Sequence, residues 1–295
     1  MSVLSRFIQG ASALALCSGL AVPVQAEASA DAPIIVTADD LIREARAQVR
    51  KRPGGADVVD AARFSDMLAV SLGDALAFSP GVYVQPRFGQ EVRLSVRGSG
   101  ISRGYHMRGL TLLQDGIPIN FADDNGDFQE LDPQVFERID VYRGANALRY
   151  GGSTLGGAIN AVTPTGRTAP RAELRVDGGS FSTVRTKLAV AHADERGDAY
   201  LALTTDRGHG DRDHARRDAL RFNGNVGIRL AEGIETRFYA SLNRIDQDLP
   251  GALTLDAALR NPRQALAGNI ALDQARDIDS VRLQNRTTFE KAAGG

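Results

Sequence analysis

Three side chains of one short segment are spaced like the first ligands of a calcium loop. Asp123, Asn125 and Asp127 occupy alternate positions, and oxygen ligands at positions 1, 3 and 5 bind Ca²⁺ in EF-hand loops. Such a loop needs glycine at position 6, where this sequence has Phe128. We therefore interpret the segment as a turn of a larger domain, with calcium binding as the less favoured alternative.

A second polar segment combines histidine with aspartate. His209, Asp211, Asp213 and His214 have side chains that can coordinate transition metals. Because the residues around them, 205–218, are almost all polar or charged, we interpret the segment as a solvated loop and assign no metal site. No nucleophile is recognisably paired with a general base. The sequence therefore predicts no catalytic residue, no enzyme activity and no cofactor.

Glycine gathers in two stretches, 98–104 and 151–157, that could be mistaken for phosphate-binding loops. Neither stretch continues into Gly-Lys-Ser/Thr, and the first lacks the glycine spacing of a dinucleotide-binding turn. Glycine also serves where the backbone needs positive φ or close packing. We interpret both stretches as tight turns of a compact domain.

The N-terminus has the pattern of an export signal. Arg6 precedes a short apolar run, residues 7–22, and Val24-Gln25-Ala26 fits a small-x-small cleavage site. The sequence thus predicts a signal peptide over 1–26, with a membrane anchor as the alternative. Cys17, the only cysteine, lies inside it, so no disulfide is expected in the mature chain. The formal charge of −1 argues against nucleic acid as a partner.

Residues 53–166 predict a mixed α+β domain. Apolar residues at helical spacing indicate a helix over 64–78, which Ser79-Pro80-Gly81 ends. Asp115-Gly116 indicates a turn between two strands. Short strands are expected at 82–84, 92–96, 110–113 and 139–142.

Beyond Pro164 the sequence alternates strictly between apolar and polar residues. Six strands are expected, near 171–176, 184–190, 199–204, 219–230, 236–242 and 281–290. One face of these strands is apolar. The other carries long polar side chains that suit a water-filled lumen, and long connections alternate with short ones, as in outer-membrane barrels. A soluble sandwich is the alternative. Six strands cannot close such a barrel, so the sequence is interpreted as truncated.

One stretch of 22 residues, IDVYRGANALRYGGSTLGGAIN (139–160), is similar to the plug signature of TonB-dependent outer-membrane receptors. Leu94 to Gly98 and Leu113 to Pro118 resemble two further plug motifs of that family. Ala145 stands where the family usually has proline. The sequences of two segments, Leu148 to Gly151 and Asp248 to Leu253, resemble those of the ferric citrate-type branch.

The resemblance implies an α+β plug domain followed by an antiparallel transmembrane β-barrel in the outer membrane of a Gram-negative bacterium. The boundaries expected are a signal peptide at 1–26, a TonB box and linker at 27–52, a plug at 53–166 and the first part of the barrel at 167–295. The implied activity is import of a scarce nutrient, most readily a ferric chelate or siderophore. The alternatives are a non-iron anionic cofactor as the cargo, or a soluble secreted binding protein.

Residues 34–38 form an isolated strand-forming patch among polar neighbours and resemble the TonB box. An exposed extended segment can add as a strand to a partner's sheet, so TonB is the expected partner of Ile34, Ile35, Val36, Thr37 and Ala38. A strand inside the plug is the alternative. Too few residues precede the patch for a signalling domain.

The resemblance also places three plug loops at the outer face. In these loops Arg87, Arg103 and Tyr105 are expected to bind a small anionic ligand such as a ferric chelate, through charged hydrogen bonds and stacking. Ordinary solvation of the loops is the alternative. Arg207, Arg212, Arg216 and Arg217 in the first long outer loop are additional candidates. Outer-membrane lipid is the expected partner of the barrel's apolar face.

Overall fold

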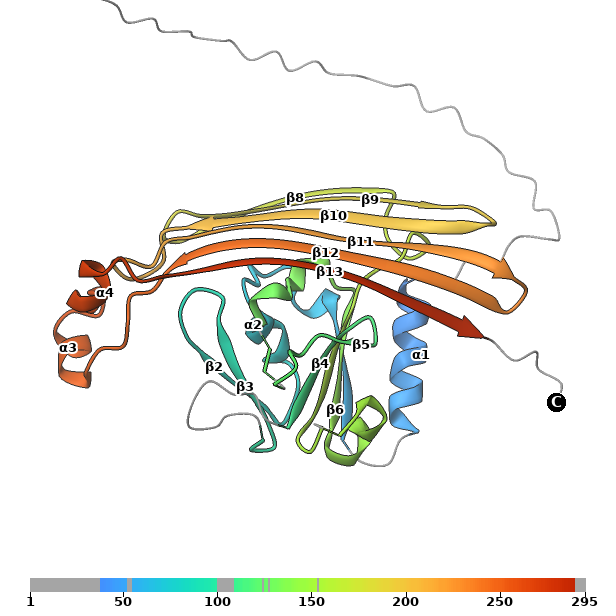
Figure 1. Cartoon of the computed structure of the whole chain (residues 1–295), viewed down its shortest axis with the longest axis horizontal. Coiled ribbons are helices and arrows are strands. Elements are labelled where there is room, and N and C mark those ends of the chain that lie inside the picture. The colour runs from blue at the N-terminus through green and yellow to red at the C-terminus, as the bar shows by residue number, and fades with distance from the viewer. Residues whose placement is uncertain are drawn as a thin grey trace, which may run out of the picture. The chain divides into compact units, whose positions relative to one another are not determined.

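The computed structural model describes residues 38–51, 55–99, 109–123, 125–126, 128–152 and 154–289 (Figure 1). The chain divides into residues 1–35 and 36–295, and everything described here belongs to the second unit. The expected signal peptide and the first four residues of the expected TonB box, Ile34 to Thr37, lie outside the described residues.

Helix α1 (Ala38–Arg50) occupies part of the segment expected to be a linker. The last residue of the expected box, Ala38, begins this helix. Ile42, Ala45 and Val49 recur at helical spacing, and Ile42 is buried. Arg46 makes an ion pair with Asp60 of the plug, at 3.2 Å. The sequence analysis did not predict this helix, because the many charged residues concealed its narrow apolar stripe.

The plug contains a five-stranded sheet in the order β1-β6-β7-β4-β5. Strands β4 and β7 are parallel, and the other neighbours are antiparallel. The sheet is formed by β1 (Ala56–Asp60), β4 (Leu110–Gln114), β5 (Ile117–Pro118), β6 (Arg138–Arg143) and β7 (Gly157–Val162). Its core is fully buried at Leu110, Leu112, Ile139, Val141 and Ile159. A separate hairpin, β2 (Val82–Pro86) and β3 (Val92–Val96), packs beside it.

The turn between β4 and β5 confirms the turn expected at Asp115-Gly116. Both residues have positive φ, 55° and 82°, as a tight hairpin turn requires, and glycine and aspartate tolerate that conformation. The turn projects from the plug sheet and, as shown below, reaches the wall of strands that follows.

The helix expected over 64–78 is much shorter than predicted. Helix α2 (Leu72–Leu76) begins after Ser71, and the Asp74 carboxylate accepts a hydrogen bond from the Ser71 backbone N–H at 2.9 Å. This capping interaction fixes the start of the helix. The preceding residues form a short 3₁₀ helix, Ala61–Arg63, and turns that bury Phe64.

Six antiparallel strands in sequence order form the second layer, called the wall here (Figure 1). They are β8 (Ala172–Gly179), β9 (Thr183–Ala193), β10 (Gly197–Gly208), β11 (Arg217–Ala231), β12 (Ile234–Asp248) and β13 (Ala275–Phe289). This confirms the six expected strands. Within the described residues the wall is open, because β8 and β13 are not paired with each other.

Connections between the wall strands differ at its two ends. Residues 194–196 and 232–233 make the short turns of the end called inner, whereas 209–216 and 249–274 make the long loops of the outer end. The longest loop contains α3 (Leu255–Arg260) and α4 (Ala267–Ala271). No helix in the described parts of the chain is long and apolar enough to cross a membrane.

The wall faces differ as the alternation predicted. Paired residues across the strands place Leu188, Leu203, Phe222, Leu242 and Val281 in one apolar row, in which Phe222 is half-buried and the other four are exposed. Apolar residues continue along the same face of β11 from Leu220 to Leu230, about 33 Å of strand at roughly 3.3 Å per residue. A strand of that length tilted by about 40° rises about 25 Å, the height of the apolar band of outer-membrane barrels.

The opposite face is polar, but it differs from the expected water-filled lumen. Its residues Arg185, Arg221, Asn223 and Asn225 are buried, with 2% or less of their surface exposed. They pack against the plug, which the wall covers (Figure 1). The alternation predicted which side chains face inward. It could not predict that the plug would take the place of water.

Candidate functional site

A buried cluster of ion pairs joins the plug to the outer half of the wall. Asp132 of the plug accepts from Arg185 of β9 (Nη2 to Oδ1, 2.8 Å) and from the Thr204 hydroxyl of β10 (2.7 Å). Arg185 also pairs with Asp206 at 2.8 Å, and Arg217 pairs with Asp206 at 2.6 Å. Burial would raise the pKa of Asp132, but the nearby guanidiniums, Arg185 first, lower it to about 2. The carboxylate therefore stays charged as a fixed anchor.

The β4–β5 turn makes a second contact with the wall. The Asp115 carboxylate accepts hydrogen bonds from the Thr163 backbone N–H (2.8 Å) and hydroxyl (2.9 Å), which join two plug segments. Arg286 of β13 donates to the Asp115 carbonyl oxygen at 2.7 Å. Burial raises the pKa of the Asp115 carboxyl to about 6, because its hydrogen bonds and Arg286 compensate only in part.

Beside this turn, polar side chains of wall strands β11 and β13 bind the plug. Gln114 donates to Asn223 of β11 at 3.1 Å and accepts from Arg282 of β13 at 3.0 Å. Arg282 pairs with Glu130 at 2.6 Å, and the Ser280 hydroxyl donates to the same carboxylate at 3.1 Å. Each contact joins groups that would be costly to bury alone.

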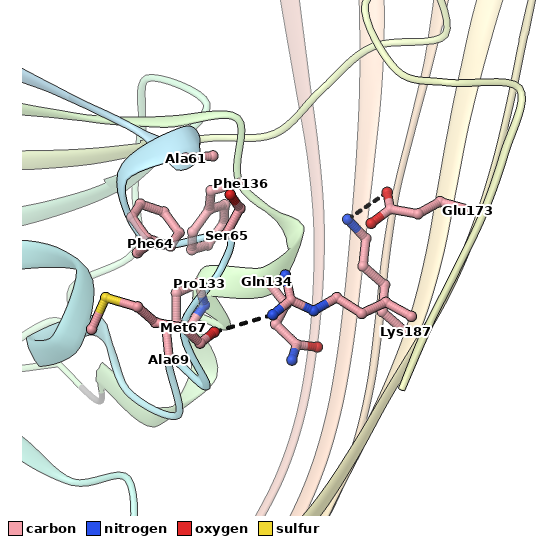
Figure 2. Close-up of a pocket in the computed structure, with 11 residues that line it drawn as sticks. Ala61, Phe64, Ser65, Met67, Ala69, Pro133, Gln134, Phe136, Glu173 and Lys187 are labelled. Atoms are coloured by element: carbon pink, nitrogen blue, oxygen red, sulfur yellow. Dashed lines mark hydrogen bonds and ion pairs between the residues drawn. The ribbon is translucent and has the colours of Figure 1, made fainter. Parts of the chain in front are cut away.

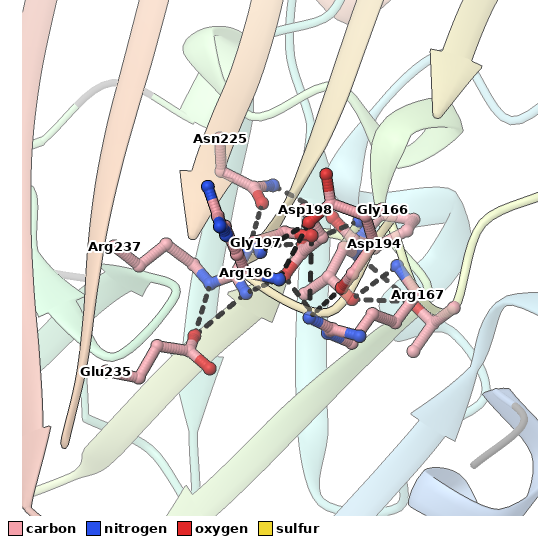
Figure 3. Close-up of polar contacts among 12 residues, drawn as sticks. Gly166, Arg167, Asp194, Arg196, Gly197, Asp198, Asn225, Glu235 and Arg237 are labelled. Carbon is pink, nitrogen blue, oxygen red and sulfur yellow. Dashed lines mark hydrogen bonds and ion pairs between the residues drawn. The ribbon is translucent and has the colours of Figure 1, made fainter. Parts of the chain in front are cut away.

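The chain leaves the plug through an anchored crossing at the inner end (Figure 3). Arg237 of β12 binds both carboxylate oxygens of Asp198, at 2.7 and 2.8 Å, and the Gly166 backbone N–H donates to that carboxylate at 2.9 Å. Arg167 lies 3.4 Å from it. A Cβ at Gly166 would lie 2.1 Å from the His192 carbonyl oxygen, so the close approach of the crossing segment to the wall requires glycine.

The tip of the β2–β3 hairpin contains Arg87, an expected ligand residue. Its guanidinium pairs with Glu91 at 2.8 Å and is half-buried. Arg276 of β13 lies 3.6 Å from the same carboxylate, and Gln247 of β12 donates to the Phe88 carbonyl oxygen at 2.9 Å. Arg87 thus belongs to a hairpin docked on the wall, and its charge is matched by Glu91. The other two expected ligand residues, Arg103 and Tyr105, lie outside the described residues.

A pocket of about 170 Å³ lies between the plug and the β8–β9 edge (Figure 2). One side is apolar, with Phe64, Met67 and Phe136. On the wall side, Lys187 pairs with Glu173 at 2.9 Å, and the Arg175 guanidinium donates to the Met67 carbonyl oxygen at 3.1 Å. Because these polar groups are already partnered, we assign no ligand to this pocket.

The outer loops hold the arginines considered as additional anion ligands. Arg207 and Arg216 pair with Asp218, and Arg217 belongs to the Asp132 cluster. Arg212 donates to carbonyl oxygens of Pro250, Gly251 and Gln264, between 2.7 and 3.2 Å.

His214 approaches the Gln274 carbonyl oxygen to 3.0 Å. In the parts of the chain with described structure, no group of three or more histidine, cysteine or acidic side chains is placed to hold a metal ion.

Sequence reasoning missed the residues that join plug and wall. Asp132, Glu130 and Asp115 are isolated acids without a recognisable motif. Their wall partners, such as Arg185 and Arg282, are part of the alternating polar face. The available signal was that several neighbouring wall strands carry arginines on their inward face. Such a concentration of positive charge indicates that acidic residues of the plug lie opposite.

Residues 48–158 match the family model described as the TonB-dependent Receptor Plug Domain. The vitamin B12 transporter BtuB of Vibrio vulnificus (strain CMCP6) is 27% identical over 135 residues, which cover 43% of this chain and 22% of that protein. The ferric aerobactin receptor of Klebsiella pneumoniae is 35% identical over 113 residues, covering 38% and 14%. The chain therefore spans less than a quarter of the length of these relatives.

Among solved structures, the unliganded ferric citrate transporter FecA is similar with a TM-score of 0.62 and 21% identity, over 75% of this chain and 35% of that one. At this identity the likeness establishes the fold alone. The expected architecture, an α+β plug followed by the first antiparallel strands of a barrel, is confirmed.

Proposed function

We propose that the protein imports a scarce nutrient across the outer membrane of a Gram-negative bacterium, because residues 48–158 match the plug-domain model of TonB-dependent receptors and residues 172–289 form antiparallel strands like the first part of such a receptor's barrel. The similar proteins of known name are transporters and receptors rather than enzymes. We extend that class to this chain, which agrees with the lack of a recognisable nucleophile–base pair in its sequence.

The observation that carries the proposal is the contrast between the two wall faces. The outward face exposes apolar rows, whereas the inward face buries charged side chains against the plug. Apolar exposure on this scale is typical of a surface that faces hydrocarbon or a partner. The plug is held by buried polar pairs together with a small apolar contact, in which Ala189, Tyr200 and Ala202 of the wall join the plug core. These features support regulated passage across a membrane.

We propose that the cargo is an anionic ferric chelate. The relatives include a ferric aerobactin receptor, and the fold is that of a ferric citrate transporter. Arg103 and Tyr105 remain the proposed ligand residues of the plug loops. Arg87 is the weaker candidate, since Glu91 already neutralises its charge. A non-iron anionic cofactor is a second candidate, because another relative transports vitamin B12.

TonB is the proposed energy-transducing partner, and Ile34 to Ala38 its proposed binding segment. The family is named for dependence on that partner. The described chain begins at Ala38, where α1 starts, so the residues that would add to the partner's sheet lie directly before a helix docked on the plug. Force applied to the segment would reach the plug through α1. Outer-membrane lipid is the proposed environment of the exposed apolar rows.

A soluble secreted sandwich is not favoured. Such a fold would bury the apolar face of its sheet under a second sheet. In the described part of the chain, Leu174, Leu203, Leu242 and Val281 are exposed instead.

The cargo is tested by a binding screen of the complete receptor with ferric citrate, hydroxamate and catecholate ferric siderophores, and cobalamin. We expect tight binding of one anionic ferric chelate, weakened at least tenfold by Arg103→Ala. Tight binding of a neutral or cationic compound that Arg87→Ala and Arg103→Ala leave unchanged would exclude the anionic cargo.

A further inference from the structure

A cleft of about 310 Å³ lies beneath α1 at the inner end of the plug. It is lined by one side of the helix, by part of the plug sheet and by the end of β13. The helix contributes Ala45, Gln48 and Val49, and the wall contributes Arg286. The plug contributes Gly116, Arg138, Asp140, Tyr142, Arg149, Tyr150 and Asn160.

The charged residues of the cleft are three arginines and one aspartate, so positive charge is in excess. Asp140 is buried, and it accepts hydrogen bonds from Arg138 at 3.2 Å and from Asn160 at 3.4 Å. Arg138 also pairs with Glu137 at 2.6 Å. The one carboxylate of the cleft is therefore committed to the arginine beside it.

The other two guanidiniums donate their described hydrogen bonds to neutral groups, while their charges also act at longer range on buried carboxyls, Arg149 on Asp140 and Arg286 on Asp115. Arg149 lies over the rings of Tyr142 and Tyr150, at 5.3 and 4.7 Å from their centroids, and donates to the Tyr150 hydroxyl at 2.7 Å. Arg286 donates to the carbonyl oxygen of Asp115 at 2.7 Å. Among the residues with described structure, no carboxylate lies within ion-pair distance of Arg149 or Arg286. Both retain donors that can bind another acceptor.

We propose that this cleft is a second anion-binding site, at the inner mouth of the plug, which takes carboxylate or phosphate groups and which α1 covers in part, Arg149 and Arg286 being exposed at its edge. The planar guanidinium fork binds such oxyanions through two parallel hydrogen bonds, and the Tyr150 hydroxyl can add a third donor. The inference rests on the proposed import of an anionic cargo, for which the site is an inner stage of the path.

The attachment of α1 suits a removable cover. The helix contacts the plug through the narrow stripe of Ile42, Ala45 and Val49, and Arg46 makes an ion pair with Asp60 at 3.2 Å. Both members of that pair are partly solvated, and such pairs contribute little to stability. Since the proposed TonB segment directly precedes α1, a pull on it would act on this helix before it acts on the plug sheet.

The test is titration of the purified receptor in detergent with pyrophosphate, measured by calorimetry in the absence of any iron chelate. Ile42→Asp combined with Arg46→Glu should release α1, which hydrogen exchange of residues 38–50 verifies. We expect the released variant to bind pyrophosphate at least tenfold more tightly than the parent. Adding Arg149→Gln and Arg286→Gln should abolish that gain, whereas the matched change Arg196→Gln, in an exposed turn of the same end, should leave it intact.

The inference is overturned if the variant with a released helix binds no more tightly, or if removing Arg149 and Arg286 leaves binding unchanged. Should release fail, Arg149→Gln and Arg286→Gln are compared with Arg196→Gln in the parent at millimolar pyrophosphate, where equal binding overturns the site. The titration needs no transport. A receptor that binds pyrophosphate in the cleft but imports nothing would contradict the proposed function and leave the site standing.

Discussion

Asp132 shows how a single plug residue is fixed by the wall. Its carboxylate holds Arg185 and Thr204, and all three groups are buried. Removing one partner of a buried ion pair leaves the other charge without compensation, which typically costs about 3 to 5 kcal/mol. The contribution of the pair lies in positioning plug and wall, since its formation also required desolvation of both charges.

We predict that Asp132→Asn destabilises the docked plug by about 3 kcal/mol, as judged from breaking a buried pair. Hydrogen exchange of residues 128–143 in the purified receptor measures it, and exchange should accelerate more than tenfold. Asp218→Asn is the matched control, because Asp218 pairs with the exposed Arg207 and Arg216. Equal effects of the two changes would show that burial of the pair is unimportant.

Asp115 has the opposite electrostatic character. Its folded pKa, about 6, lies above the unfolded value of 3.8, so the folded plug takes up a proton more readily than the unfolded chain. The ionised Asp115 carboxylate therefore lowers the free energy of unfolding of the plug above about pH 6. This destabilisation disappears as the pH falls from 6 to about 4, because the folded plug takes up the proton. Two units correspond to about 3 kcal/mol at most.

We predict that Asp115→Asn keeps the turn, since asparagine tolerates positive φ and its carbonyl oxygen can accept from Thr163. The variant should be more stable than the parent at pH 7, with a smaller gain in stability between pH 6 and 4. Unfolding of the plug followed across that pH range measures both effects, with the exposed Asp66→Asn as control. A pH dependence identical to that of the parent would exclude Asp115 as its source.

At the scale of elements, patterns that arise within one segment were predictable, and those that depend on partners were not. The Asp115-Gly116 turn, strand β3 and the six wall strands follow from local turn chemistry and period-two alternation. The predicted helix over 64–78 was too long, because Ser71 is the N-cap of α2 and its backbone N–H donates to Asp74, so the helix begins only at Leu72. Helix α1 was missed because its few apolar residues stabilise a helix only when they pack against the plug.

One arginine of the outer loops, Arg212, holds the long loop 249–274 in place. Arg212 gives four hydrogen bonds to carbonyl oxygens of Pro250, Gly251 and Gln264, and so ties the loop after β10 to the loop after β12. Guanidinium donors in a rigid fork suit this task. The arginine was a candidate anion ligand in the sequence, but the structure commits its donors to the protein.

We predict that Arg212→Ala increases hydrogen exchange of residues 249–274 at least tenfold, because the three carbonyl groups lose their shared donor. Arg216→Ala is the control, since Arg216 pairs with Asp218 at the surface. Protection in 249–274 should change little in that variant. If both variants behave alike, the loop is held by its own contacts, such as that of Asn269 with the Leu249 carbonyl oxygen.

At the scale of the whole molecule, a proposed pulling point precedes a plug that buried polar pairs and a small apolar contact hold against the polar face of the wall. The sequence predicted both layers and their order, because the plug motifs and the alternating strands are local features. It could not predict which plug residues the wall holds, since those pairs join positions far apart in the chain, such as Glu130 with Arg282. The central claim is that force on residues 34–38 drives import while ligand capture is independent of it.

The most direct test compares binding and uptake of the radiolabelled ferric chelate selected by the screen, in energised cells that carry the complete receptor with Val36→Pro. Proline removes a backbone donor from a strand ladder, so we expect ligand binding within twofold of the parent and uptake at background. Val36→Ile, which keeps a β-branched side chain, should import normally. Uptake by Val36→Pro at the parental rate, or an equal loss of binding and uptake, would contradict the account.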